Sequence, residues 1–431
     1  MEVFGSIKEN VPKTRIPVLT EKQYGFIVSE QGKRQKLRGA AGSGKTLVVA
    51  GRAVECYRRT RDKVLVLCVN DIMVPYIIDI VSMYAQDESE KKILEEKIEI
   101  ITIFDFIEKA VESISSKNKY IQQDSIIDKK IEMLYSQKNN IGSDMTYNCI
   151  LTDDTQDFEY RWLECIYDLF FVKHGEWFSA GDENQNVYKK NLTTCVDPIN
   201  GCYQQPSVPN VAGAWLELKE THRLTPQINR LANSYKTCFL NEYKNDSINY
   251  TESNQTSLPL QGKIVYKYID KNSNTNILEE VVMVIEETIS KDMVVLSDDE
   301  NLLKDLYDIY NKKNNDGYIL IETKVDDSIL AEKAKNVADV KRIRYIEDER
   351  MMIRKDKQQR FLKKEENKLF CPIKDFKGLE AETVVLVLSD CNNYRGLDEM
   401  VYTGITRSKN NLIIINMNYK YDMFFKNKQN M

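Results

Sequence analysis

The chain has 431 residues, of which 42% are hydrophobic and 29% are charged, with a formal net charge of −5. This length predicts two or three domains with ample core, and the acidic balance excludes a generally basic surface, so any nucleic-acid site must be a local cleft. The nine cysteines include no C-x-x-C pair, so we expect no metal site built on thiolates, and cysteines in apolar strands, such as Cys68 and Cys149, are typical of reduced thiols in a cytosolic protein. Neither a membrane-length apolar run nor a secretory signal in residues 1–15 is present, so we expect a cytoplasmic protein with no membrane partner.

The first predicted helix carries a glutamine, Gln23, close to its start. Thr20 can cap this helix, which we expect to run to Ser29. A glutamine amide can both donate to and accept from an adenine edge, although an exposed helix residue is the alternative when Gln23 is considered alone.

The next stretch, residues 39–46, reads GAAGSGKT and matches the phosphate-binding pattern G-x-x-x-x-G-K-[ST]. Its glycines let backbone N–H groups point at one anion, and the helix predicted over residues 46–57 adds its positive dipole end. Lys45 can place a charge on the β- and γ-phosphates, and Thr46 can offer its hydroxyl to Mg²⁺. A short strand predicted over residues 35–38 gives the motif its expected context.

A buried strand of the parallel type is predicted over residues 63–70 and ends at Asn70, where ligands bind in open α/β sheets. A helix over residues 71–85 and a second strand from residue 98, running into a helix near Phe106, come next. Residues 107–145 are interpreted as a small helical insertion. Its lysines are open to two interpretations, contacts with nucleic acid or solvated helix faces; they are Lys117, Lys119, Lys129 and Lys130.

Two further strands end in polar side chains. An apolar strand from Cys149 ends in adjacent carboxylates, of which Asp153 is placed to hold Mg²⁺ and Asp154 to orient or deprotonate water. The strand at residues 177–180 leads into a polar loop in which Gln185 is suited to sensing a γ-phosphate. Acidic pairs at strand ends also occur by chance, so each signal is only suggestive in isolation.

The C-terminal half repeats the alternation of strands and helices. Arg223 enters a helix as a candidate charge clamp, although an ordinary surface arginine is the alternative when it is taken alone. Residues 322–368 form either a small charged insertion or a mobile arm. A strand at residues 292–297 followed by a helix to Tyr310, a strand at residues 384–389 followed by a helix that continues through Lys409, and a strand at residues 412–417 are expected. We expect the tail from Tyr419 to fray.

The ordered signals resemble those of superfamily 1 helicases of the UvrD/Rep/PcrA type, especially the compact helicase-like ATPases. The resemblance covers nearly the whole chain and rests on eight stretches: Gln23, the phosphate loop, Asn70, Asp153–Asp157, Gly181–Tyr188, Thr221–Arg223, Lys377–Glu380 and Thr406–Lys409. It implies an α/β fold with two RecA-like P-loop NTPase lobes built on parallel sheets with small helical insertions, ATP lying between the lobes. The expected lobes are residues 1–212, with the insertion at 107–145, and residues 213–431, with the reduced charged insertion at 322–368.

The resemblance also implies roles for individual residues. Those expected to bind ATP and Mg²⁺ are Gln23, Gly42, Ser43, Gly44, Lys45, Thr46, Asp153, His222 and Glu380. Those expected to take part in hydrolysis are Lys45, Asp153, Asp154 as base, Gln185 as γ-phosphate sensor, and Arg223 and Arg407 as arginine fingers. Those expected to contact nucleic acid are Asn70, Thr102, Tyr188 and Lys374.

Several departures from the family pattern concern the base position and the nucleic-acid side. Asp154 replaces the usual glutamate, so we expect slower hydrolysis, and the tryptophan that often follows Tyr188 is absent. The short stretch between Arg223 and Lys377 implies a reduced accessory domain. The first hypothesis is therefore an ATP-dependent 3′→5′ helicase or translocase on single-stranded or tailed DNA. The alternative is a nucleic-acid- or nucleotide-sensing ATPase that regulates a partner nuclease in antiviral defence or DNA repair.

Overall fold

The computed structural model describes residues 19–29, 32–114, 127–188, 208, 210–211, 214–240, 251–252, 262–270, 276–290, 292–335, 337, 339–361, 368–390, 394 and 396–428. The chain divides into two compact units, each with one six-stranded parallel sheet. Unit 1 comprises Met1–Glu183 and Tyr188–Glu220, and unit 2 comprises Asn184–Val187 and Thr221–Met431. The predicted α/β fold class with two parallel-sheet lobes is confirmed. Residues 212 and 213, at the predicted lobe boundary, lie outside the described part of the chain.

In unit 1 the strand order is β3-β2-β4-β5-β1-β6, and every strand pair is parallel. Its elements are α2 (Glu21–Val28), β1 (Arg34–Gly39), α3 (Lys45–Thr60), β2 (Val64–Cys68), α4 (Met73–Met83), α5 (Glu88–Lys97), β3 (Ile98–Thr102), α6 (Ile103–Ile114), α7 (Ile127–Ser136), β4 (Tyr147–Thr152), α8 (Tyr160–Phe170), β5 (Phe171–Gly181) and β6 (Leu216–Leu218). The charged residues that follow Asp87 form α5, which the sequence analysis did not predict.

Two apolar cores cover the two faces of this sheet. Side chains alternate across each strand, so Val64 and Val66 of β2 join the core that includes α3, whereas Leu65 and Leu67 join the core that includes α6 and α8. All of β2 is therefore buried, which explains its unbroken apolar sequence. Cys149 of β4 is a buried free thiol, as expected for a strand cysteine.

In unit 2 the strand order is β11-β12-β10-β13-β14-β9, again entirely parallel. Its elements are α9 (Pro226–Phe239), β9 (Lys263–Tyr268), α10 (Ile277–Glu287), β10 (Met293–Ser297), α11 (Glu300–Asn314), β11 (Gly317–Ile319), α12 (Lys324–Ala334), α13 (Asp339–Phe361), β12 (Lys368–Pro372), β13 (Ala381–Leu388), α14 (Leu397–Ile405), β14 (Ser408–Asn416) and α15 (Tyr419–Lys426). A separate two-stranded sheet pairs β7 (Glu220–Thr221) with β8 (Thr251–Glu252). No helix in the described ranges is long and apolar enough to cross a membrane.

The expected fraying after Tyr419 is wrong, because this stretch forms α15. Asn418 caps the helix through a hydrogen bond from the Lys420 backbone N–H, and Tyr421 and Phe425 are buried. Their rings pack against Tyr235 of α9, so aromatic contacts far apart in sequence stabilise the tail. The helix expected to continue through Lys409 ends instead at Ile405, and β14 begins at Ser408, which places Arg407 in the turn between them.

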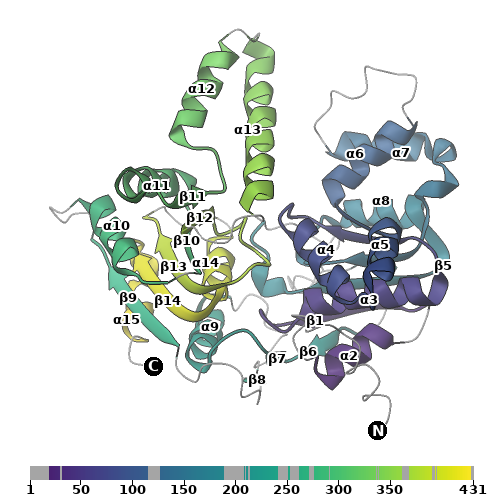
Figure 1. Ribbon diagram of the computed structural model, residues 1–431, viewed down its shortest axis with the longest axis horizontal. Helices are drawn as coiled ribbons and strands as arrows, with labels where there is room; N and C mark the ends of the chain where they lie inside the picture. Colours follow the sequence, from purple (N-terminus) through teal and green to yellow (C-terminus); the bar gives the residue numbers. More distant parts are fainter. Residues whose placement is uncertain are drawn as a thin grey trace, which may run out of the picture. The chain divides into compact units, whose positions relative to one another are not determined.

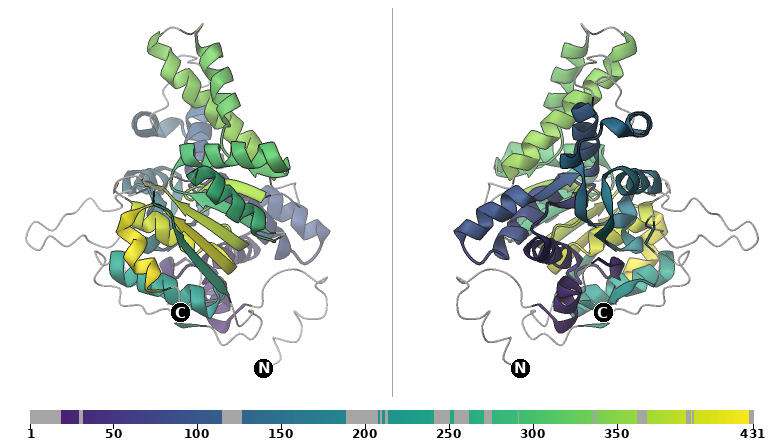
Figure 2. Two further views of the ribbon diagram at one scale, coloured as in Figure 1. Left: turned by 90° about the vertical axis from the view of Figure 1, so that its left-hand side faces the viewer. Right: turned by 90° about the vertical axis from the view of Figure 1, so that its right-hand side faces the viewer.

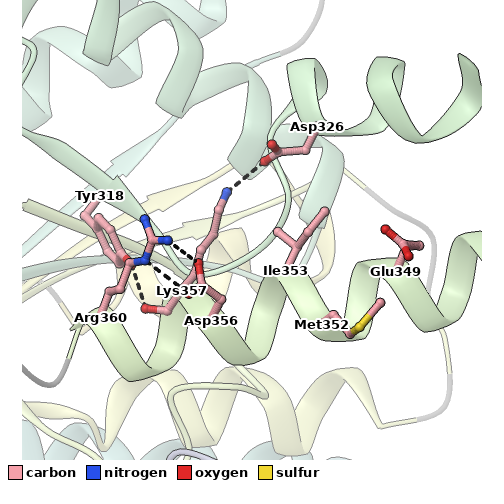
Figure 3. Close-up of a pocket in the computed structure, with 8 residues that line it drawn as sticks. All are labelled: Tyr318, Asp326, Glu349, Met352, Ile353, Asp356, Lys357 and Arg360. Atoms are coloured by element: carbon pink, nitrogen blue, oxygen red, sulfur yellow. Dashed lines mark hydrogen bonds and ion pairs between the residues drawn. The ribbon is translucent and has the colours of Figure 1, made fainter. Parts of the chain in front are cut away.

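The charged insertion forms a helical hairpin, which we call the arm. Its helices α12 and α13 lie side by side and stand out from the sheet of unit 2 (Figure 1 and Figure 2). At the foot of the arm, Lys357 Nζ lies 2.9 Å from Asp326 (Figure 3). Lys357 of α13 is therefore tied to the first turn of α12.

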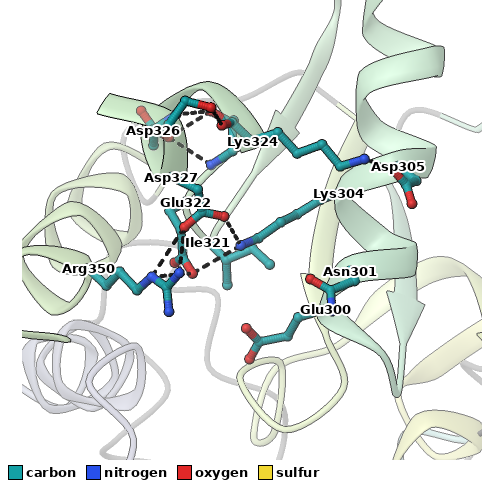
Figure 4. A network of polar contacts seen from close by, with 12 residues as sticks. Glu300, Asn301, Lys304, Asp305, Ile321, Glu322, Lys324, Asp326, Asp327 and Arg350 are labelled. Carbon is teal, nitrogen blue, oxygen red and sulfur yellow. Dashed lines mark hydrogen bonds and ion pairs between the residues drawn. The ribbon is translucent and has the colours of Figure 1, made fainter. Parts of the chain in front are cut away.

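An ion-pair network anchors the arm to the sheet (Figure 4). Glu322, only 1% exposed, accepts hydrogen bonds from Arg354 of α13 at 2.7 and 3.0 Å and from Lys304 of α11 at 3.1 Å. Arg350 pairs with Asp327 at 2.8 Å. Burial alone would raise the pKa of Glu322, but the hydrogen bonds and charges of the basic side chains outweigh it and lower the pKa to about 2.

A Glu322→Gln variant is expected to lose about 3 kcal/mol of unfolding free energy at pH 7, because it leaves buried cations uncompensated. Since the folded pKa lies below the unfolded one, the carboxylate stabilises the fold above pH 4.5 and loses this contribution as the pH falls toward 2. The difference in unfolding free energy between variant and native protein, measured by denaturant titration, should therefore be less than half as large at pH 3 as at pH 7. Glu332→Gln, at an exposed position of α12, is the matched control. An equal loss at both pH values would contradict the assignment.

Candidate nucleotide site

The phosphate loop connects the end of β1 to the start of α3. Gly42 and Gly44 have φ angles of +75° and +83°, which favour glycine. A Cβ atom at position 44 would also lie 2.4 Å from Nε2 of Gln23. The backbone at position 44 therefore favours glycine, and a side chain there would displace the Gln23 amide.

Two side chains of the loop are turned into it. Lys45 Nζ donates hydrogen bonds to the carbonyl oxygens of Gly39 at 2.9 Å and Ala40 at 3.0 Å, and only 8% of the residue is exposed. Ser43 is fully buried, and its backbone N–H bonds to Ala40 O at 3.2 Å. The loop is thus a closed turn whose lysine stands at the N-terminus of a 16-residue helix, a position suited to an anion.

Gln23 connects this loop to α2. Its Nε2 donates to Ser43 O at 2.9 Å, and its Oε1 accepts from the Thr20 N–H at 2.8 Å in the capping box of α2. The side chain is 3% exposed, so the amide supports the loop as well as the helix start. The amide retains a second N–H and a second oxygen lone pair that could bond an adenine edge, and this contact stays a prediction.

The best-defined pair in the site joins the loop to β4. Thr46 Oγ1 donates to Asp153 Oδ2 at 2.8 Å, and Asp153 Oδ1 is buried with no hydrogen-bond partner among the described residues. Burial, followed by the charge of Asp154, raises the pKa of Asp153 to about 7. A divalent cation would satisfy the buried oxygen and favour the charged carboxylate. The donor set of one hydroxyl and one carboxylate therefore fits Mg²⁺.

Asp154 follows in a left-handed backbone conformation, with φ of +51°. Gln156 Nε2 donates to Asp154 Oδ1 at 3.0 Å, and Gln156 Oε1 accepts from the backbone N–H of Asp182 at 2.9 Å. Gln156 thus fixes Asp154 relative to the end of β5. No role for Gln156 was predicted from the sequence, although its place in the Asp153–Asp157 stretch was the available signal.

Three residues predicted to contact nucleic acid lie in unit 1. Thr102 is 1% exposed, and its hydroxyl donates to Asp105 Oδ2 at 2.8 Å at the start of α6. Asn70 Oδ1 accepts from the Ile72 N–H at 3.2 Å, and Tyr188 is half-buried. Thr102 and Asn70 each have a local structural role, so their contact with nucleic acid stays a prediction.

In unit 2, Arg407 is 1% exposed, and each nitrogen of its guanidinium group donates a hydrogen bond. Its Nη2 donates to Gln185 Oε1 at 2.7 Å, and its Nε donates to Thr403 O at 3.1 Å. A further bond reaches Leu379 O at 3.3 Å. The predicted finger and the predicted γ-phosphate sensor are therefore direct partners, which their separation of 222 residues did not reveal.

The second predicted finger, Arg223, forms an ion pair with Glu380, which also pairs with Lys409 at 3.1 Å. Burial would raise the pKa of Glu380, but the charges of Arg223 and Lys409 outweigh it, so the net shift is downward. His222 is half-buried next to this cluster in sequence, and Lys374 pairs with Glu300 at 2.7 Å. The candidate residues therefore form two groups, one around the phosphate loop of unit 1 and one around Arg407 and Glu380 of unit 2.

The loop, the strand order and the carboxylates at strand ends define unit 1 as a P-loop nucleotide-binding fold. No protein-family model matches the sequence, and a search of curated proteins gives no match. Among solved structures, the chain is similar to the arterivirus nonstructural protein 10 helicase. The complex with DNA gives a TM-score of 0.39 and 11% sequence identity, and the match covers 92% of this chain and 63% of that chain. The structure of the helicase alone gives a TM-score of 0.38 and 11% identity, and the match covers 92% of this chain and 62% of that chain. This chain thus spans less than two thirds of either structure, and the TM-scores are too low to bear on activity.

Proposed function

We propose that the protein hydrolyses ATP and uses the cycle to move along single-stranded DNA, as a superfamily 1 helicase or translocase with 3′→5′ direction. The observation that carries the proposal is the Thr46–Asp153 pair. It places a buried carboxylate oxygen, with no hydrogen-bond partner in the described part of the chain, beside the lysine-bearing phosphate loop. This combination suits a magnesium–nucleotide complex and has no evident structural purpose.

The chain's own residues supply most of the proposed chemistry. Lys45 exchanges the carbonyls of Gly39 and Ala40 for phosphate oxygens, while the loop N–H groups and the α3 dipole hold the anion. Thr46 and Asp153 would hold Mg²⁺, which when bound would neutralise phosphate charge. Asp154, fixed by Gln156, orients the attacking water and accepts its proton.

The roles proposed for the second group follow from its chemistry. Gln185 contacts the γ-phosphate, and Arg407 and Arg223 stabilise the charge that develops during transfer, since a guanidinium fork binds phosphate oxygens and stays charged. Glu380 accepts from the ribose, and His222 packs against the adenine. On the nucleic-acid side we assign Asn70, Thr102, Tyr188 and Lys374.

A second candidate is a nucleic-acid-sensing ATPase subunit that regulates a partner nuclease. The arm is the feature that favours it, because α13 exposes the apolar side chains of Ile343 (73%) and Met351 (63%), which a partner protein would cover. The two candidates differ in whether the chain alone separates a duplex.

Hydrolysis should rise with single-stranded DNA, and Lys45→Ala should lower it by about 10²-fold or more, because the variant loses the charge on the transferred phosphate. A coupled phosphate-release assay with and without DNA measures both effects. Unwinding of 3′-tailed but not 5′-tailed duplex then supports the helicase, whereas DNA-stimulated hydrolysis without unwinding supports the regulator. Unchanged hydrolysis in Lys45→Ala would eliminate both candidates.

A further inference from the structure

A groove of about 710 Å³ lies along the arm, within unit 2 (Figure 3). Most of its lining comes from one face of α13, together with Tyr318 of β11. The α13 residues involved are Glu349, Met352, Ile353, Asp356, Lys357 and Arg360. Their spacing of three or four residues keeps them on one side of the helix from Glu349 to Arg360, a rise of about 16 Å. The groove is therefore elongated along a helix axis.

The middle of the groove is apolar. Met352 is 57% exposed, and the next residue, Ile353, is half-buried, whereas the half-buried Tyr318 lies farther along the groove, next to Arg360 (Figure 3). The Tyr318 hydroxyl donates to the Lys357 carbonyl at 2.6 Å, so its polar end is satisfied within the chain. Methionine adapts its shape to varied apolar partners, and contiguous exposed apolar surface marks a binding site.

The charges in the groove are compensated except for one. Lys357 pairs with Asp326 at 2.9 Å, and Arg360 pairs with Asp356 at 2.9 Å. Glu349 makes no hydrogen bond or ion pair with any residue that the structure describes. Its carboxylate lies one turn from Met352, so the groove presents an apolar floor with an uncompensated negative charge at one end.

A neighbouring face of α13 holds the groove in place. Arg350 and Arg354 point to the acidic groups of the anchoring network, Asp327 and Glu322, while Glu349 and Met352 face the groove. Because these ion pairs already hold the helix in position, binding a ligand does not have to order it. The groove is thus preformed, which lowers the entropic cost of binding.

We propose that this groove binds a basic amphipathic helix of a partner protein. Apolar side chains one turn apart would pack on Met352, Ile353 and Tyr318, and a lysine or arginine would pair with Glu349. This is the helix-in-groove mode, in which anchors at i, i+3/i+4 and i+7 provide the contact. The inference goes beyond ATP hydrolysis and does not depend on it.

The test uses a fluorescein-labelled leucine–lysine peptide with helical amphipathic spacing, and a scrambled peptide of the same composition, in anisotropy titrations with the full chain. Glu349→Lys and Met352→Asp should each weaken binding of the amphipathic peptide by about tenfold or more. Glu347→Lys is the matched control, because it makes the same charge change at an exposed position of α13 and should change binding less than twofold. Thermal melting and ATP hydrolysis, expected to be unchanged in all three variants, report on folding.

Several results would overturn the proposal. Equal weakening by Glu347→Lys and Glu349→Lys would mean that the peptide senses only overall charge. Equal affinity for the scrambled peptide would exclude helix-in-groove binding. If the amphipathic peptide does not bind at all, a basic amphipathic helix is not the ligand of the groove. Binding of labelled single-stranded DNA to native protein that Met352→Asp weakens by about tenfold or more would assign the groove to nucleic acid instead.

Discussion

An Asp153→Asn variant is expected to lose Mg²⁺-dependent ATP hydrolysis by about 10³-fold, since a bound metal contributes several kcal/mol of transition-state stabilisation. Asparagine keeps the size of the side chain and can still accept the 2.8 Å hydrogen bond from Thr46. It removes the negative charge at the buried oxygen that has no hydrogen-bond partner in the described structure. The loss should therefore come from the cation and not from a distorted loop.

Asp154→Asn is the matched comparison, because the two aspartates are adjacent but have different proposed roles. Isothermal titration with ATP, with and without Mg²⁺, should show that Asp153→Asn loses the gain in affinity due to the metal, whereas Asp154→Asn keeps it. In single-turnover hydrolysis Asp154→Asn should still fall by about 10²-fold or more, as for loss of a general base. Asp154→Glu should remain active.

Two results would contradict these assignments. If Asp153→Asn retains metal-dependent ATP affinity, Asp153 does not hold the ion. If Asp154→Asn hydrolyses ATP as fast as the native protein, Asp154 is not the base.

The ends of the strands in unit 1 were predictable because their signals are local. The glycines and Lys45 of the phosphate loop lie in eight consecutive residues, and Asp153 directly follows an apolar strand. Parallel strands bring their carboxyl ends to one edge of a sheet, so pattern and topology together place these groups. By contrast, the bond from Gln23 to Ser43 and the link from Gln156 to Asp182 join separate segments, and no local pattern reveals them.

The arm shows why other features could not be predicted. The apolar residues of α13 do not gather on one face, so its periodicity gives little indication of a docked helix. Arg354 is instead fixed by Glu322 and Glu300, which are 32 and 54 residues away in sequence. Charged side chains can remain solvated or form pairs, and only the tertiary structure decides between these outcomes.

Glu300 has a further consequence for the proposed motor. It pairs with Lys374 at 2.7 Å and with Arg354 of the arm at 2.7 Å. A phosphate that binds Lys374 would compete with this carboxylate, which would then pair with Arg354 alone. The arm and a residue assigned to nucleic acid therefore share one acidic partner.

An Arg407→Ala variant is expected to lower kcat for ATP hydrolysis by about 10³-fold, the usual contribution of an arginine finger. Lysine at this position should not restore the rate, because it lacks the planar fork that can bond Gln185 and a phosphate oxygen together. Steady-state kinetics should show the loss mainly in kcat, whereas KM for ATP changes little if Arg407 acts in the transition state.

Because Arg407 is buried and bonded to Thr403 and Gln185, its removal also perturbs the fold, so stability needs a separate measurement. Thermal melting of Arg407→Gln, which keeps some hydrogen bonding, separates the two effects: it should melt nearer the native protein and remain as inactive as Arg407→Ala. A double variant with Gln185→Ala should lose little more activity than Arg407→Ala alone, since partners that act as a unit are not additive. Fully additive losses would mean that the 2.7 Å contact has no part in hydrolysis, and native activity in Arg407→Gln would remove Arg407 from the reaction.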